Sequence, residues 1–244
     1  MSYVFSVGFL VCIFFSTVGL AQPTLQHYGG MQIHEGAQIG LYSSFVNQAP
    51  FEQQAGLFGF YGNKEIRISG DFALLLSDVE IFRGPSVFLD QSFSVGDNLS
   101  FIQGDFRTDK TLPEIYITLL QNAMTMGEAN ASKVNGYVTA INQSRIVFPV
   151  GDAAQYRPLT LEGEVFPIAK CAYFREDPNA PSAFQPFRTD LKPRTIEAVS
   201  TAEFWRLEGV NTGQVTLSWN PDSSLGSIAL TVPEITLMGW SKSS

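Results

Sequence analysis

The sequence predicts an all-β protein with two regions. Residues 22–135 are expected to form a short-strand β region, which we interpret as an irregular β-solenoid, with a sandwich of short strands as the alternative. Residues 136–244 are expected to form an antiparallel β-sandwich. Three observations support this prediction: apolar and polar residues alternate over short runs, turn-forming residues separate the runs, and no stretch shows the spacing of an amphipathic helix.

The composition sets the class of protein and of partner. The chain has 244 residues, enough for one large all-β domain or two small ones, and 45% of them are hydrophobic, so a sizeable core is expected. Only 16% are charged and the net charge is -8. This composition argues against nucleic acid and against docking on an anionic membrane, because both partners need clustered basic residues.

Residues 1–21 have the features of a signal peptide. An apolar run over residues 4–20 ends with small residues at Gly19 and Ala21, which suit cleavage after Ala21. The first three residues lack the usual Lys or Arg, and an uncleaved membrane anchor is the alternative. We therefore expect a protein that is secreted or on the cell surface, or periplasmic in the alternative, with no membrane insertion after cleavage.

Cleavage would leave Cys171 as the only cysteine, so no internal disulfide is expected. The residue lies in an apolar run over residues 168–174. We expect it to be buried as a small hydrophobic side chain.

The first region consists of short runs of alternating residues. Residues 65–69 alternate most regularly, and unevenly spaced glycines prevent a fixed repeat from being counted. Residues 115–120 are ambiguous between strand and helix, and their β-branched side chains favour a strand. Further strands are expected at residues 31–34, 37–41, 56–61, 79–81, 87–89, 93–95 and 99–101.

The second region has longer and more aromatic runs. Pro149 is expected to end the strand before it, and Gly151-Asp152 supplies a turn. Residues 176–193 contain four prolines and predict a long loop. Strands are expected at residues 136–141, 145–148, 158–162, 165–174, 203–208, 215–219, 227–232 and 234–240.

The order of the motifs from about Leu99 onward carries a resemblance. The motifs are Phe148-Pro149-Val150-Gly151-Asp152, Tyr156-Arg157-Pro158-Leu159, Ala172-Tyr173, Val199-Ser200 with Glu203-Phe204-Trp205, Thr216-Leu217-Ser218-Trp219-Asn220 and Leu237-Met238-Gly239-Trp240. In this order the chain resembles secreted surface proteins of Bacteroidota, which often carry type IX secretion sorting domains or gliding-motility-associated C-terminal domains. The resemblance implies no catalytic residues. Such proteins continue beyond this point, so we expect the second region to be truncated at its C-terminal end.

Metal ligands are scarce in this sequence. His27 and His34 are the only histidines, too few for a multi-histidine zinc site, and both are expected in solvated loops. Oxygen-rich turns at residues 96–98, 176–179 and 220–223 would suit calcium best, but ordinary turn chemistry explains them. No cofactor is predicted.

Paired carboxylates offer the one enzymatic chemistry that needs no His or Cys. Asp78 and Glu80 are expected on one face of a strand, as are Glu162 and Glu164 if Gly163 does not break theirs. A glycoside hydrolase would need two such groups across a cleft.

Tryptophans are the candidate binding residues. Trp205 and Trp240 are the possible glycan contacts, because sugar rings stack on exposed indoles. The alternative is that these two and Trp219 all fill the core, since Trp219 alternates with Val215 and Leu217. Arg157, just after the turn, is expected to pair with a carboxylate and pin the hairpin.

These observations predict a non-enzymatic, secreted or cell-surface module with a structural or adhesive role in a larger exported protein. Its partners would be cell-surface or extracellular matrix components, including glycans. The alternatives are a carbohydrate-binding module that uses exposed tryptophans and a glycoside hydrolase that uses paired carboxylates.

Overall fold

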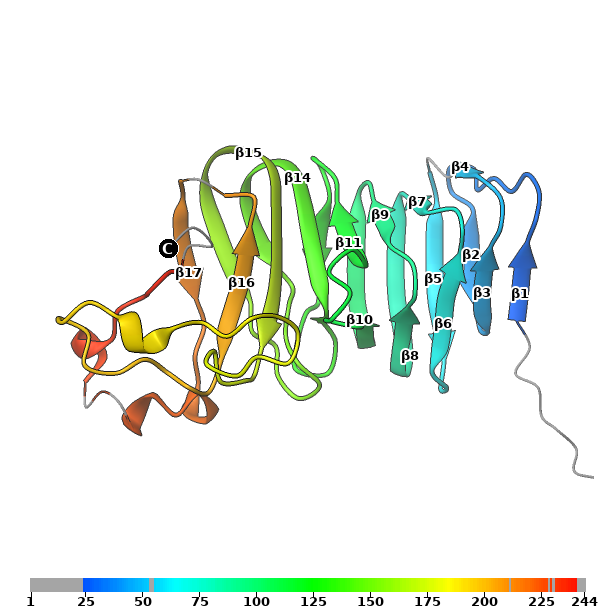
Figure 1. The fold of residues 1–244 in the computed structure, drawn as a ribbon. Helices are drawn as coiled ribbons and strands as arrows, with labels where there is room; N and C mark the ends of the chain where they lie inside the picture. The colour runs from blue at the N-terminus through cyan, green and yellow to red at the C-terminus, as the bar shows by residue number, and fades with distance from the viewer. Residues whose placement is uncertain (1–23, 53–54, 211, 228, 230, 241–244) are drawn as a thin grey trace, which may run out of the picture.

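The computed structural model describes residues 24–52, 55–210, 212–227, 229 and 231–240. The predicted signal peptide, residues 1–21, lies outside the described residues. The described chain winds into a stack of coils that begins with β1 at one end and finishes at β16 and β17 at the other (Figure 1). This arrangement confirms an all-β protein whose first region is a β-solenoid-like stack.

Each coil contributes up to three short strands, and successive coils pair in parallel. The first coil supplies β1 (Thr24–His27). The second coil supplies β2 (Gln38–Leu41), β3 (Ser44–Asn47) and β4 (Phe51–Glu52), and the third supplies β5 (Leu57–Gly62), β6 (Ile66–Gly70) and β7 (Leu74–Leu76). The fourth coil supplies β8 (Asp78–Leu89) and β9 (Phe93–Val95), and the fifth supplies β10 (Asn98–Thr108) and β11 (Tyr116–Leu119). The sixth coil supplies β12 (Met124–Met126), β13 (Val134–Asn135) and β14 (Tyr137–Phe148).

The coils present three faces. The first face holds β2, β5, β12 and the first halves of β8 and β10. The second face holds β1, β3, β6, β13 and the second halves of β8 and β10, and the third holds β4, β7, β9, β11 and β14. Because β8 and β10 run across the corner, the first two faces form one continuous sheet.

That corner requires a glycine. Gly104 has φ +91°, and a Cβ there would lie 1.6 Å from the carbonyl oxygen of Arg83 in the preceding coil. Only a residue without a side chain fits this approach and this left-handed backbone.

The step between coils is uneven. On the first face Gln38 pairs with Leu57 and Leu57 pairs with Asp78, which are steps of 19 and 21 residues. Asn98 then pairs with Met124, 26 residues later. Because the extra residues are absorbed in the turns, the strands stay in register although the sequence has no fixed period.

The core is an internal aromatic stack that runs along the coils. Alternation in each strand directs every second side chain inward. Phe45, Phe58, Phe60, Phe93 and Phe106 are all buried, and neighbouring rings lie 5.4 to 6.4 Å apart between centroids. All five of these pairs are tilted or edge-to-face, which is the favourable geometry for aromatic rings.

The C-terminal part adds antiparallel strands to the sheet of the third face, where an antiparallel β-sandwich was expected. β14 pairs in parallel with β11 on one side and antiparallel with β15 (Leu159–Phe174) on the other. β16 (Phe204–Glu208) and β17 (Gln214–Leu217) both pair antiparallel with β15. All four strands continue the sheet of the third face, so the described strands of this part belong to one sheet rather than to two facing ones.

Several expectations for single elements can be compared with the structure. Residues 115–120 do contain a strand, β11, and β14 ends at Phe148, directly before Pro149. β14 and β15 are each one strand where the sequence indicated two. The strands expected at residues 227–232 and 234–240 are wrong. The described residues there adopt 3-10 turns, η3 (Leu225–Ser227) and η4 (Val232–Glu234), and irregular chain, because Pro233 interrupts any ladder.

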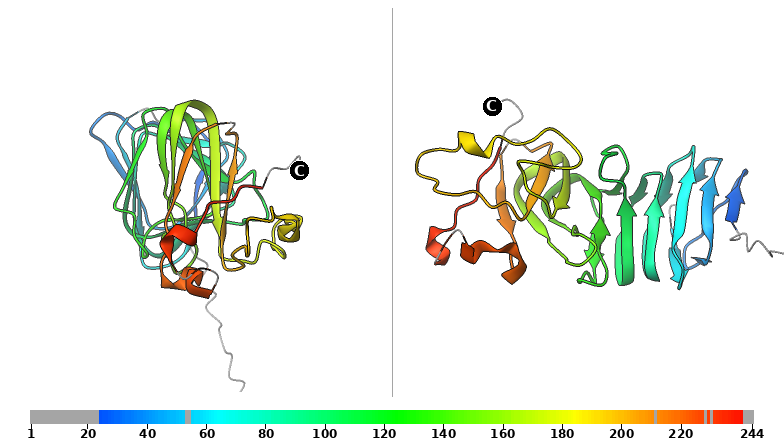
Figure 2. Two further views of the ribbon diagram at one scale, coloured as in Figure 1. Left: turned by 90° about the vertical axis from the view of Figure 1, so that its left-hand side faces the viewer. Right: turned by 60° about the horizontal axis from the view of Figure 1, so that its bottom comes forward.

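The predicted Pro-rich loop is confirmed, and it covers the outer surface of the last strands. Its Phe184 and Phe187 pack on Phe204, with ring centroids 5.8 and 5.5 Å away, and Phe204 stacks on Phe174 at 5.0 Å. The loop lies beside the coils in the end-on view of Figure 2. On the inner side of the same sheet Cys171 is fully buried, as predicted, and burial raises the pKa of its thiol.

Replacing Phe106 tests the internal aromatic stack. We expect Phe106→Ala to lower the free energy of unfolding by about 3–5 kcal/mol. Removal of the buried ring would leave a cavity between the rings of Phe60, Phe93 and Phe101, which come from three coils. Ile102→Ala in the same strand, whose side chain is 55% exposed, should change it by less than about 0.5 kcal/mol. Chemical denaturation measures both, and equal losses would contradict the assignment of the core.

Candidate functional site

Three aromatic side chains from successive coils point outward at one position of the first face. We call Tyr42, Tyr61 and Phe82 the aromatic row. Tyr61 pairs with Phe82 in the strand register, and Leu41 pairs with Phe60, which brings the next residues, Tyr42 and Tyr61, abreast. Gln103 pairs with Phe82 and occupies the same position in the following coil. Leu41, Phe60 and Ile81, directly before the three aromatic residues, are buried, so alternation places the row on the outside.

Two glycines form the floor beneath the tyrosines. A Cβ on Gly59 would lie 2.2 Å from Cζ of Tyr61, and one on Gly40 would lie 2.9 Å from Cδ2 of the same ring. The ring of Tyr61 therefore lies against bare backbone. Its neighbour Tyr42 packs beside it, with ring centroids 5.7 Å apart and an interplanar angle of 43°. The glycines leave space that lets large rings lie low on the sheet.

A carboxylate fixes the outer end of the central tyrosine. The Tyr61 hydroxyl donates a hydrogen bond to Oε1 of Glu80 at 2.9 Å. Partial burial and then this hydrogen bond raise the pKa of Tyr61 from 10 to about 12. The phenol therefore remains protonated in the neutral range and holds one orientation.

Arg83 holds the turn that follows the central tyrosine. Its guanidinium donates to the carbonyl oxygens of Tyr61 and Lys64, and its side chain is only 1% exposed. Burial lowers the pKa of Arg83. In the same corner Ser86 donates to Glu65 at 3.0 Å. The residues of one coil therefore fix the turn of the previous coil, and with it the backbone at Tyr61.

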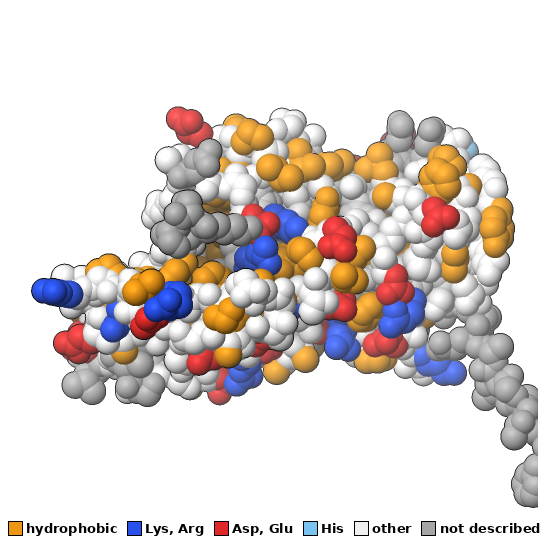
Figure 3. Space-filling model, in the orientation of Figure 1, with side chains coloured by type: hydrophobic (Ala, Val, Ile, Leu, Met, Phe, Trp, Pro, Cys, Tyr) orange, Lys and Arg blue, Asp and Glu red, His pale blue; other side chains and the backbone are white. Residues whose placement is uncertain are grey.

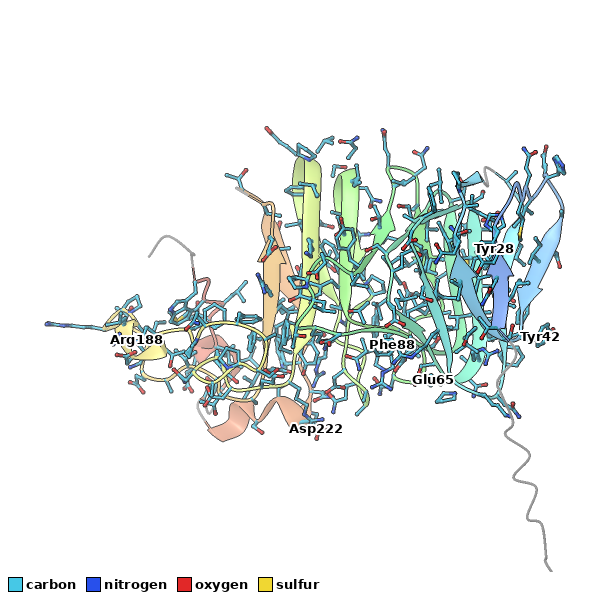
Figure 4. All side chains as sticks on the ribbon, turned by 45° about the vertical axis from the view of Figure 1, so that its right-hand side comes forward. Tyr28, Tyr42, Glu65, Phe88, Arg188 and Asp222 are labelled. Carbon is cyan, nitrogen blue, oxygen red and sulfur yellow. The ribbon has the colours of Figure 1, made fainter. Side chains whose placement is uncertain are left out.

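A hollow of about 490 Å³ opens over the aromatic row. Tyr42 and Phe82 are 71% and 51% exposed beside it, and Figure 4 labels Tyr42 near the N-terminal end of the solenoid. The hollow is lined by Tyr42, Tyr61, Gly62, Asn63, Phe82, Gly84 and Gln103. These residues offer ring faces, two amides and two hydroxyl groups, and none of them carries a formal charge. The arrangement suits binding by stacking and neutral hydrogen bonds.

The carboxylates of the expected pair Asp78 and Glu80 accept hydrogen bonds from side chains of neighbouring coils. Asp78 accepts from Nδ2 of Asn98 at 2.7 Å, and Glu80 accepts from Tyr61. Asp78 borders a second hollow of about 560 Å³, where Asp97 accepts from Ser77 at 2.7 Å. Elsewhere Glu162 is paired with Arg145 at 2.5 Å. Figure 3 shows acidic and basic side chains intermingled in this way on one face of the molecule.

The tryptophans belong to β16, to the segment after β17 and to the C-terminal segment, and β16 and β17 lie at the opposite end of the stack from β2 and β5 (Figure 1). Trp205, in β16, is partly buried; its Nε1 donates to the carbonyl of Arg157 at 3.0 Å and its ring packs on Tyr173. Trp240 is partly buried in the irregular segment after η4. Trp219 is 53% exposed, so its expected place in the core is wrong. The reason is that β17 ends at Leu217 and the alternation does not continue.

Arg157 pairs with a carboxylate, as predicted. Its Nε donates to Oε2 of Glu203 at 3.1 Å, with both side chains less than a tenth exposed. Its Nη2 also donates to Asn220 and Ser223, and the Tyr173 hydroxyl donates to the same Glu203 oxygen at 2.6 Å. The pair therefore joins the start of β15 to the segments before β16 and after β17, rather than pinning a local hairpin.

His27 and two of the acidic turns make hydrogen bonds within the described part of the chain. The expectation that His27 lies in a solvated loop is wrong: it is buried at the end of β1, where its Nδ1 is hydrogen-bonded to Oδ1 of Asn47 at 2.6 Å. His34 is exposed. Asp177 accepts hydrogen bonds from the following turn, and Asn220 caps a 3-10 turn, η2 (Pro221–Ser223). Among the described residues no cluster of three or more His, Cys, Asp or Glu is placed to hold a metal ion.

Sequence reasoning missed the aromatic row although a signal for it exists. Gly40-Leu41-Tyr42 and Gly59-Phe60-Tyr61 repeat a Gly-apolar-Tyr pattern 19 residues apart. The third coil continues it as Glu80-Ile81-Phe82. Glycine two residues before an aromatic residue indicates a ring that lies along its own strand, and the spacing matches one coil.

Comparisons with known proteins leave the family open. No protein-family model, no curated protein and no solved structure matches the chain. The resemblance to surface proteins of Bacteroidota therefore stays a prediction. Within the described residues no helix has the length and hydropathy needed to cross a membrane.

The pKa of Tyr61 gives a first test of the site. Because its folded-state pKa of about 12 lies above the usual 10, the resulting stabilisation is complete below pH 10 and is lost as the pH rises toward 12. We expect the difference in phenolate absorbance between the wild type and Tyr61→Phe to titrate near pH 12. Glu80→Gln should move this midpoint partway back toward 10, because burial remains. A midpoint of 10 in the wild type would contradict the described environment.

Two arginine variants test the buried ion pair. Arg157→Ala should destabilise the fold by about 3–5 kcal/mol, because it leaves Glu203 buried without its partner. Arg145→Ala removes a pair with Glu162 whose side chains are 66% and 44% exposed, and should cost less than about 1 kcal/mol. Thermal and chemical denaturation measure both, and an unchanged stability of Arg157→Ala would refute the role given to the pair.

Proposed function

We propose that this protein is a non-enzymatic module of a secreted or cell-surface protein, and that it binds carbohydrate through the aromatic row. The observation that carries the proposal is the aromatic row in an uncharged hollow, with Tyr42 and Phe82 exposed and Tyr61 partly buried between them. Sugar rings have apolar faces of C–H groups, which pack on aromatic rings, and hydroxyl edges, which hydrogen-bond to amides.

The central tyrosine of the row is held in place, which favours binding. The ring of Tyr61 is confined by the backbone of Gly59 below it and by its hydrogen bond to Glu80. Arg83 fixes the turn that follows. Because these contacts within the protein already confine the Tyr61 ring, little of its side-chain entropy is left to lose when a ligand binds.

The scaffold suits an adhesive or structural role. Stacked coils transmit the position of one coil to the next through parallel ladders, so the row keeps its spacing along the solenoid. The predicted signal peptide and the resemblance to exported surface proteins support a location outside the cytoplasm, at the cell surface or in the extracellular medium, with the periplasm as the alternative. The partners we propose are therefore glycans of a cell surface or an extracellular matrix.

Hydrolysis has less support than binding. Asp78 and Glu80 lie on the same side of one strand, not opposite each other, and each accepts a hydrogen bond from a neighbouring coil. The geometry of a glycoside hydrolase places its two carboxyl groups on either side of the bond that is cleaved. This favours the non-enzymatic alternative.

Removing the exposed aromatics should abolish binding. We expect Tyr42→Ala and Phe82→Ala each to weaken binding to soluble polysaccharides about tenfold, through loss of one stacking contact, and the double variant to lose measurable retention in affinity gels.

Tyr28→Ala is the matched control for this test. Tyr28 is 71% exposed, as is Tyr42, but it follows β1 and does not line the hollow (Figure 4). This variant should bind as the wild type does. If no polysaccharide in a broad panel binds, or if the control loses as much binding as the row variants, the proposed function is wrong.

A further inference from the structure

We infer that the aromatic row takes an uncharged, extended polysaccharide whose chain runs along the solenoid axis, across the coils. This inference rests on the proposed function and adds the class of ligand and its direction. It follows from the register of the row, from the charges around it and from the amides at its end.

The register sets the direction. Tyr42, Tyr61 and Phe82 come from three successive coils at one position of the strand, so the row crosses the strands. Neighbouring strands lie about 4.8 Å apart. This spacing is close to the length that one pyranose residue adds to an extended chain. A ligand that lies across the coils therefore places successive sugar rings over successive aromatic rings, whereas a ligand along a strand meets only one ring.

Gln103 extends the same line by one coil. It pairs with Phe82 and is exposed, and its side chain lines the hollow. From Tyr42 to Gln103 the row covers three strand spacings, about 14 Å. An amide at this place donates and accepts hydrogen bonds and so matches a pair of adjacent sugar hydroxyls. The row therefore fits a segment of three to four sugar residues.

The charges near the row do not favour an anionic ligand. Arg83, next to Phe82 in the chain, turns its guanidinium inward to the carbonyls of Tyr61 and Lys64 and is only 1% exposed. Lys64 is exposed but does not line the hollow. The nearest outward carboxylate, Glu80, lies beside Tyr61. With a net charge of -8, the protein as a whole also repels polyanions.

The second face shows what a charged row looks like in the same scaffold. Phe88 lies between Arg67 and Arg107 in the register, and the Arg67 guanidinium is 4.3 Å from the Phe88 ring centroid. Arg67 is paired with Asp90 at 2.6 Å and Arg107 with Glu65 at 3.7 Å. Figure 4 labels Phe88 and Glu65. The second face thus alternates aromatic and charged groups, while the aromatic row is neutral along its length.

The experiment is calorimetric titration of the full chain with neutral and anionic oligosaccharides. The neutral probes are cello-, xylo- and manno-oligosaccharides of two to six residues, and the anionic probe is oligogalacturonate of the same lengths. We expect at least one neutral series to bind, with affinity rising about fivefold for each residue up to four and little beyond, because each residue adds one contact. Oligogalacturonate should bind at least about tenfold more weakly.

Phe82→Ala tests the direction of the chain. It interrupts the row between Tyr61 and Gln103, so affinity should stop rising beyond two sugar residues, whereas Tyr28→Ala should leave the length dependence unchanged. If binding depends on the row but not on the length of the oligosaccharide, the inference that the ligand runs along the solenoid axis is wrong. If oligogalacturonate binds more tightly than the neutral series, the inference that the ligand is uncharged is wrong. Neither result contradicts the proposed function. Binding of neither class would remove the proposed function itself.

Discussion

Parallel pairing between successive coils is the constraint on which the rest of the structure depends. Each strand of a coil finds its hydrogen-bond partners in the coils before and after it, so every position of the strand is repeated along the axis. Inward positions then stack into a column, and Phe58, Phe60 and Phe106 form its aromatic centre. Outward positions stack by the same rule, which is why two tyrosines and a phenylalanine far apart in the sequence meet on the first face.

Polar contacts within the corners keep this repetition regular although the coils differ in length. Arg83 reaches back to carbonyls of the preceding turn, Asn98 to Asp78, and Ser77 forward to Asp97. Each contact joins one coil to its neighbour, so the turns are fixed where no ladder exists. At the C-terminal end, the Arg157–Glu203 pair has the same effect over longer distances and attaches the last strands to the stack.

The sequence predicted the strands and their approximate places because alternation and turn residues are local signals. It did not reveal the coil length, since the steps of 19, 21 and 26 residues differ and only the pairing shows which residues are equivalent. The aromatic row was missed for the same reason: Tyr42 and Tyr61 become neighbours only when the register is known. For Arg157 the carboxylate partner was predicted correctly, because a buried guanidinium needs one, but the hairpin was not, because Glu203 lies 46 residues away and only the tertiary structure brings it near. Trp219 was placed wrongly, because alternation says nothing about where a strand ends.

Coils that each add one equivalent surface position make this architecture extensible. Duplication of the coil that contains β5 would insert one new strand into each face. Each new strand would pair in parallel with the two strands between which it is inserted, so the parallel pairing of successive coils would be kept. The outer surface would grow by one ring and the interior column by one layer at the same time. Evolution or protein engineering can thus alter the length of such a surface in whole-coil increments, while the chemistry of each position is changed independently by point substitution.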